Sequence, residues 1–126
     1  MENRSGEWVK QSDYDLDTAE YMFKGGRYIY AVFICHLAVE KAQKGLYYEK
    51  RREIPPKSHN LIFLLNQIDI KPPKGPGKFI VKLNEASIPN HYPESLAKLQ
   101  QVYDEFTTKE ILSQAKDFII WIKKQF

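Results

Sequence analysis

The sequence predicts an all-α protein, an up-and-down bundle of four to five helices that forms a single domain over residues 1–126. Three observations predict this fold. Apolar residues recur at steps of three and four along most of the chain, and the alternation typical of strands is rare. Glycine and proline gather at a few positions between these periodic segments. The 126 residues also have a hydrophobic content of 43%, which is enough for one core.

The first two helices are predicted on either side of a glycine turn. The first should end at Gly25-Gly26, because glycine readily adopts the left-handed conformation that terminates helices. The second should then run from Arg27 to Arg52. The apolar stripe of the first helix consists of Val9, Ser12, Leu16, Ala19 and Phe23.

A third helix is expected after a proline break. Pro55-Pro56 should interrupt the chain, and Ser58 is the expected N-cap of a helix that carries the apolar residues between 61 and 68. The segment KPPKGPGKF, Lys71 to Phe79, follows this helix. Its three prolines and two glycines predict a loop.

The remaining helices are predicted from shorter signals. A short helix is expected around Phe79 to Ala86, and a break should follow at Pro89 and Pro93. Thr107-Thr108-Lys109-Glu110 has the spacing of a capping box, in which the first hydroxyl and the last carboxylate satisfy free backbone amides. The last helix should therefore begin there.

The second predicted helix has two different faces. Its small residues should let another helix approach closely, and Cys35 among them is expected to be a buried apolar side chain without nucleophilic character. The opposite polar stripe should meet solvent, a partner subunit or a ligand. On a solvated face, Glu40 and Lys44 would contribute only about 0.2–0.5 kcal/mol as an i,i+4 pair. The small residues are Ala31, Cys35, Ala38, Ala42 and Gly45, and the stripe comprises His36, Glu40, Gln43, Lys44 and Tyr47.

No metal or cofactor is predicted. His36 and Glu40 at i,i+4 could supply two metal ligands, but the same helix offers no third, and His59 and His91 are distant in sequence. The glycines of the proline-rich segment lack the strand and the Lys-Ser/Thr of a phosphate-binding loop.

Composition indicates a cytoplasmic protein. No stretch approaches the roughly 20 apolar residues of a membrane-spanning helix. The N-terminus, MENRSGEWVK, is too polar for a signal peptide. The single cysteine is consistent with a reducing compartment. A net charge of +3 permits an anionic partner without requiring one.

Several motifs occur in the order found in one family. Trp8 opens the first helix, and Ala38-Val39-Glu40-Lys41-Ala42 with Lys44 lies in the second. Ser58-His59-Asn60-Leu61 is similar to a Thr-His-Asp-Leu segment, and His91-Tyr92-Pro93 stands in the place of Arg-Tyr-Pro. In this arrangement the chain resembles the HEPN domain. Further matching positions are Asp15, Leu16, Ala19, Tyr28 and Ala31.

The resemblance implies a helical bundle that forms homodimers, is often encoded beside a minimal nucleotidyltransferase, and is connected with nucleotides or RNA. We therefore favour a dimeric binding module for a nucleotide or RNA, with a nucleotidyltransferase as its protein partner. A purely structural dimerisation module is an alternative.

Many members of this family are metal-independent endoribonucleases, some of toxin type in toxin–antitoxin pairs, that use an arginine and a histidine four to six residues apart. Six residues separate Arg52 from His59, which satisfies this count and makes Arg52 and His59 candidate catalytic residues. The intervening EIPPKS contains two prolines, whereas the family's motif belongs with a later helix. Catalysis therefore stays the second hypothesis, and His59 as a residue that orders the loop stays open as well.

A phosphate group is expected to bind near Arg52 and His59. Lys50, Arg51 and Lys57 add positive charge to this turn, and the free backbone amides of a helix N-terminus attract anions. The full predicted nucleotide or RNA site comprises Glu40, Lys41, Lys44, Arg52, His59, His91 and Tyr92.

Overall fold

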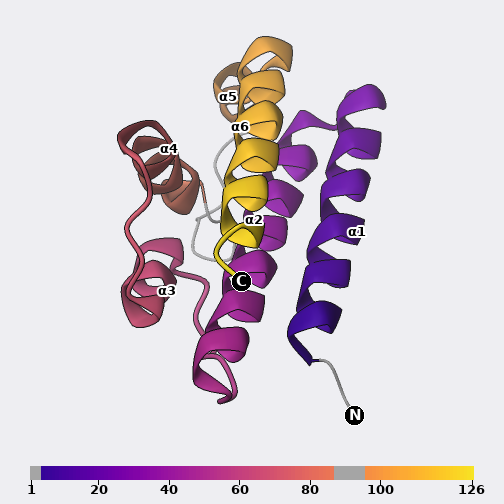
Figure 1. The fold of residues 1–126 in the computed structure, drawn as a ribbon. Coiled ribbons are helices and arrows are strands. Elements are labelled where there is room, and N and C mark those ends of the chain that lie inside the picture. Colours follow the sequence, from indigo (N-terminus) through magenta and orange to yellow (C-terminus); the bar gives the residue numbers. More distant parts are fainter. Residues whose placement is uncertain (1–3, 87–95) are drawn as a thin grey trace.

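The computed structural model describes residues 4–86 and 96–126, and these form six helices and no strand (Figure 1). The all-α class is therefore confirmed for the described residues, with one or two helices more than predicted. None of these helices is both long enough and apolar enough to cross a membrane. The helices are α1 Arg4–Lys24, α2 Tyr28–Arg51, α3 Leu61–Ile68, α4 Lys74–Glu85, α5 Leu96–Val102 and α6 Glu105–Lys123.

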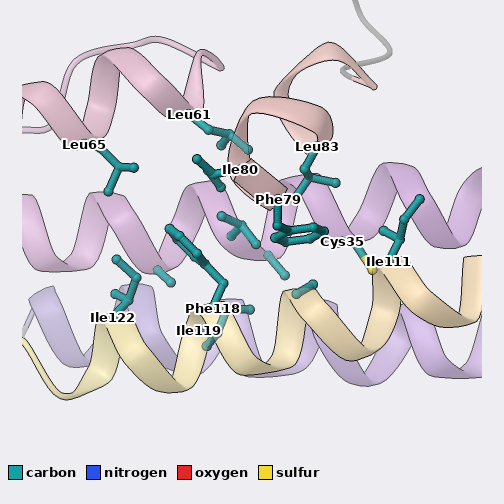
Figure 2. Packing of buried hydrophobic residues seen from close by; sticks show 14 of the residues in the cluster. Cys35, Leu61, Leu65, Phe79, Ile80, Leu83, Ile111, Phe118, Ile119 and Ile122 are labelled. Carbon is teal, nitrogen blue, oxygen red and sulfur yellow. The ribbon is translucent and has the colours of Figure 1, made fainter. Parts of the chain in front are cut away.

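Helix α2 is the centre of the bundle. It packs against α1, α6 and α3, and α4 in turn packs against α3 and α6 (Figure 1). Side chains of α3, α4 and α6, including Leu61, Leu83 and Phe118, meet around α2 in the core (Figure 2). Phe118 is fully buried. The core thus consists mostly of residues that the periodic patterns place on inner faces.

The turn between α1 and α2 confirms the predicted glycine stop. The amide of Arg27 donates to the carbonyl of Met22, and that of Gly26 donates to the carbonyl of Phe23. Gly26 has a φ of +78°. These two bonds and the left-handed residue form a Schellman motif, which only a residue without Cβ adopts at little cost.

The small face of α2 allows α1 to approach closely, as predicted. Ala31, Ala38 and Ala42 are at most 1% exposed. A Cβ added at Gly45 would lie 2.9 Å from the Cβ of Trp8. Such a distance is shorter than side-chain carbons tolerate, so Gly45 is the position that lets Trp8 pack against the backbone of α2.

The predicted starts of the third and last helices are wrong by two residues or more. Asn60 caps α3 in place of Ser58, because its Oδ1 accepts from the amides of Ile62 and Phe63 at 3.1 and 3.0 Å. Asp104 caps α6 and accepts from the amide of Thr107 at 2.8 Å. Asparagine and aspartate are stronger N-caps than threonine and at least equal to serine. Asn60 therefore caps α3 two residues after Ser58, and Asp104 caps α6 three residues before Thr107.

The predicted loop from Lys71 to Phe79 is confirmed only as far as Pro73, since α4 begins at Lys74. Pro76 is the third residue of this helix. The first amides of a helix have no intrahelical partner, so a proline there removes no hydrogen bond. The predicted break at Pro89 and Pro93 lies outside the described residues.

Candidate functional site

The polar stripe of α2 is buried, which excludes solvent from the three predicted alternatives of solvent, a partner subunit or a ligand. His36, Glu40 and Lys44 are 5%, 4% and 8% exposed. The start of α3 and the residues before it cover the stripe. Gln43 shows this directly, because its Nε2 donates to the backbone carbonyl of Leu61 at 3.1 Å.

Glu40 is the centre of a cluster of charged and polar side chains. Its Oε1 lies 2.8 Å from Nδ1 of His59, and its Oε2 lies 3.0 Å from Nζ of Lys44. Nδ1 of His36 is 4.0 Å from the same Oε1. Two donors therefore hold the two carboxylate oxygens separately, which satisfies a charge that would otherwise be expensive to bury.

His59 connects this buried cluster to the surface. Its side chain is 57% exposed, whereas that of Glu40 is 5% exposed. Because the carboxylate accepts from Nδ1–H, the tautomer is fixed and Nε2 is the ring nitrogen left for a ligand. Asn60 follows as the N-cap of α3, so the backbone next to the ring is also held. The arrangement presents an oriented imidazole at the surface.

His36 lies deeper and has a different electrostatic character. Burial lowers its pKa below 6.5, and the nearby carboxylate of Glu40 opposes part of this shift. Its Nε2 has no hydrogen-bond partner among the described residues. His36 is therefore neutral at pH 7 and is a packed neighbour of the cluster rather than its exposed end.

Comparison with known proteins assigns the family. The HEPN domain matches the sequence over residues 5–125, which is nearly the whole chain. This chain belongs to the HEPN domain family. No curated protein matches its sequence.

Two crystal structures share the HEPN-like bundle. TT1696 from Thermus thermophilus has a TM-score of 0.85 and 22% identity, covering 99% of this chain and 100% of that chain. ST0689, an archaeal HEPN homologue, has a TM-score of 0.80 and 29% identity, covering 99% of this chain and 98% of that chain. The first likeness concerns the fold alone, and the second agrees with the family assignment.

In this HEPN domain, Arg52 contacts Glu49 and Tyr48 and not His59 in the described structure. Its guanidinium is 3.1 Å from Glu49 and lies 5.9 Å from the ring centre of Tyr48, with the side chain 66% exposed. Arg52 is also the left-handed C-cap of α2, with a φ of 55°. The described structure records no contact between Arg52 and His59, although both lie near the end of α2.

The other predicted site residues divide between two places. Lys44 joins Glu40 in the cluster, but Nζ of Lys41 lies 2.8 Å from Asp15 of α1 and so points to a different helix. His91 and Tyr92 lie outside the described residues. The spacing of His36 and Glu40 was a usable signal for the cluster, but no local pattern predicts that His59 completes it.

The described residues contain neither a metal site nor a reactive cysteine. No group of three or more His, Cys, Asp or Glu side chains in residues 4–86 and 96–126 is arranged to hold a metal ion. Burial raises the pKa of Cys35 to about 12. The thiol is therefore not ionised at neutral pH, in agreement with its predicted place in the core.

Proposed function

We propose that this HEPN-domain protein is a binding module for the phosphate groups of a nucleotide or of RNA, with His59 at the centre of the site. The observation that carries the proposal is the contact between the half-exposed His59 ring and the buried Glu40 carboxylate, 2.8 Å long. A ring held through Nδ1 loses little conformational freedom when Nε2 meets a ligand. When the ring is protonated, Nε2–H can donate to a phosphate oxygen.

Positive charge near His59 supports an anionic ligand. Lys50, Arg51, Arg52 and Lys57 are all exposed on the end of α2 and on the connection to α3. Glu49 and Glu53 offset only part of this charge. An exposed arginine bound to one glutamate exchanges readily for a phosphate, because surface ion pairs contribute only about 0.2–1 kcal/mol.

Association with a second copy and with a nucleotidyltransferase belongs to the same proposal. Family resemblance supports both partners, and exposed apolar side chains support the first. Tyr14 and Tyr21 on α1 are 73% and 77% exposed and seven residues apart, which places them on one face. Phe106 and Ile120 on α6 are 73% and 52% exposed and lie fourteen residues apart, so they also share one face of their helix. Sedimentation at tens of micromolar tests the dimer, since a pair with micromolar affinity is populated there.

Binding measurements with matched variants test the site. Arg52→Ala and His59→Ala should each weaken binding of a labelled RNA oligonucleotide or of ATP by about ten- to a hundredfold, because a charge-assisted contact contributes about 1.5–3 kcal/mol. Lys109→Ala in the second turn of α6 removes one positive charge from an exposed side chain and should leave binding unchanged. The start of α6 and the end of α2 lie at opposite ends of the bundle (Figure 1). Full binding by both site variants would contradict the proposal and put the site elsewhere, and a parent protein that binds neither ligand would leave a purely structural dimer.

A metal-independent ribonuclease is the second candidate, and the Glu40–His59 contact favours it. A carboxylate that fixes the tautomer of a histidine is a common support for a general base, and His59 could accept the proton of a ribose 2′-hydroxyl. Arg52 would first have to leave Glu49 to reach the same phosphate. Incubation of RNA with the parent protein and a chelator separates the candidates. Cleavage that persists with chelator and disappears in His59→Ala would establish the enzyme, whereas binding without cleavage would keep the binding module.

A further inference from the structure

An open groove lies where the first turns of α1 approach the end of α2. Residues from the first turns of α1 form one wall, and residues from the last turn of α2 and the segment after it form the other. Figure 1 shows the start of α1 and the end of α2 at the same end of the bundle. Trp8, Gln11, Tyr48, Ile54 and Pro55 are among its lining residues, and its volume is about 700 Å³. This volume falls within the roughly 300–1,000 Å³ typical of small-molecule sites.

We propose that this groove binds the base of a nucleotide and that the phosphate of the same nucleotide reaches Arg52. The inference rests on the proposed function and extends it, because it assigns the base a place that the phosphate site alone does not define. The ligand is either a free nucleotide or a nucleotide within single-stranded RNA, since both present the same base and phosphate.

The aromatic side chains of the groove suit a nucleic-acid base. Trp8 and Tyr48 face the groove from different helices, and neither is fully buried. Nucleic-acid bases stack on aromatic rings, whatever the base, because each has a flat π-face. Ile54 adds an apolar side chain that is 74% exposed beside these rings. An exposed isoleucine next to two accessible aromatic rings suits a planar, partly apolar ligand.

Trp8 is held in place before any ligand binds. Its Cβ packs against the backbone of α2 where Gly45 has no side chain, and Nζ of Lys44 lies 6.0 Å from the centre of its ring. Lys44 in turn binds Glu40, which binds His59. The Trp8 ring of the groove is therefore linked to His59 through the side chains of Lys44 and Glu40.

The position of Arg52 indicates on which side of the groove the phosphate of the ligand would lie. Its guanidinium lies over the ring of Tyr48 at 5.9 Å, so a positive group stands beside a wall of the groove. Gln11 and Glu7, which bind each other at 3.3 Å on the opposite wall, offer an amide and a carboxylate for the edge of a base. The base then has stacking partners and polar contacts, and the phosphate has a cation.

Tryptophan fluorescence can test this placement. The sequence has two tryptophans, so Trp121→Phe leaves Trp8 as the sole indole reporter. A nucleotide that stacks on Trp8 should quench its emission, and inorganic phosphate at the same concentration should not. Tyr48→Leu in this background should weaken binding of ATP about tenfold or more. Tyr30→Leu, an exposed tyrosine that lines a different pocket, is the matched control and should bind like the parent.

The possible results distinguish the groove from the phosphate site. Quenching by ATP and by a short RNA oligonucleotide, with loss in Tyr48→Leu, supports the groove, and the tighter of the two ligands identifies the source of the base. Binding can instead depend on Arg52 and His59 without quenching Trp8 or responding to Tyr48→Leu. That result would overturn the proposal for the groove and support the phosphate site. If the parent protein binds neither ATP nor RNA, both proposals fail. Because the parent background carries Trp8 and Tyr48 intact, the quenching result holds even if Tyr48→Leu proves unstable.

Discussion

Replacing Glu40 by glutamine should destabilise the protein far more than the sequence spacing indicates. The variant keeps the size of the side chain but removes the negative charge, while Lys44 keeps a positive charge on a side chain that is 10% exposed. Removing one partner of a buried ion pair costs about 3–5 kcal/mol, because the other charge stays desolvated. The amide oxygen can still accept from His59, so we expect a loss of about 3 kcal/mol, at the lower end of that range.

Urea unfolding followed by circular dichroism measures this loss, and a midpoint shift with an unchanged slope would identify it as a change in stability. In a thermal scan the same loss lowers Tm by about 10 °C for a chain of this size. Lys44→Met added to Glu40→Gln should restore part of the stability, because it removes the unpaired ammonium. Glu49→Gln is the matched control, because its ionic partner Arg52 is 66% exposed and the amide oxygen can still accept from Oγ of Ser5, so stability should change by less than about 1 kcal/mol.

Two results would refute this account of Glu40. One is a loss of less than about 1 kcal/mol for Glu40→Gln, which is the range of exposed pairs. The other is a double variant whose loss of stability equals the sum of the losses measured for Glu40→Gln alone and Lys44→Met alone, because independent sites add and coupled ones do not. Either would mean that water reaches Glu40 and Lys44 in solution.

Three further predictions concern α2. Gly45→Ala should destabilise the protein by about 1–3 kcal/mol, because the added methyl group overpacks against Trp8. Gly77→Ala in α4 meets only ordinary contacts and should be neutral or stabilising by up to about 1 kcal/mol. Equal urea midpoints for the two variants would contradict this prediction. Burial lowers the pKa of His36 below 6.5, so the unfolded chain gains a proton before the folded one as pH falls. Tm should therefore decrease from pH 7.5 to 5.5, and by less in His36→Gln. Burial raises the pKa of Cys35 to about 12, so a thiol reagent at pH 8 should label only the protein unfolded in urea.

The long helices could be predicted because their signals are local. The stop of α1 at Gly25-Gly26 depends on a few consecutive residues, and the bounds of α2 agree with the prediction within one residue at each end. The small face of α2 is likewise a property of that helix. Helix periodicity and glycine geometry act over one or two turns, so a sequence pattern contains the information that determines them.

The start of α4 shows where local signals are ambiguous. Three prolines and two glycines between Lys71 and Phe79 have the composition of a loop, yet most of the segment is helical. Proline and glycine disrupt a helix in its interior, whereas Pro76 lies in the first turn. Composition alone does not tell a first turn from a loop, and the apolar residues that bind α4 to the core come only afterwards, beginning with Phe79.

The candidate site could not be predicted in full, because its decisive contact spans the fold. Glu40 and His59 are nineteen residues apart, and they meet only because α2 ends at the left-handed Arg52 and the chain returns through Pro55-Pro56 to cover the polar stripe. The local spacing of Arg52 and His59 fits a catalytic motif, but the same reversal of the chain gives each residue a different partner. A motif count records distance along the sequence, whereas the chemistry of His59 depends on the carboxylate beneath it. The buried charge of Glu40 is therefore a better guide to the role of this histidine than its spacing from an arginine.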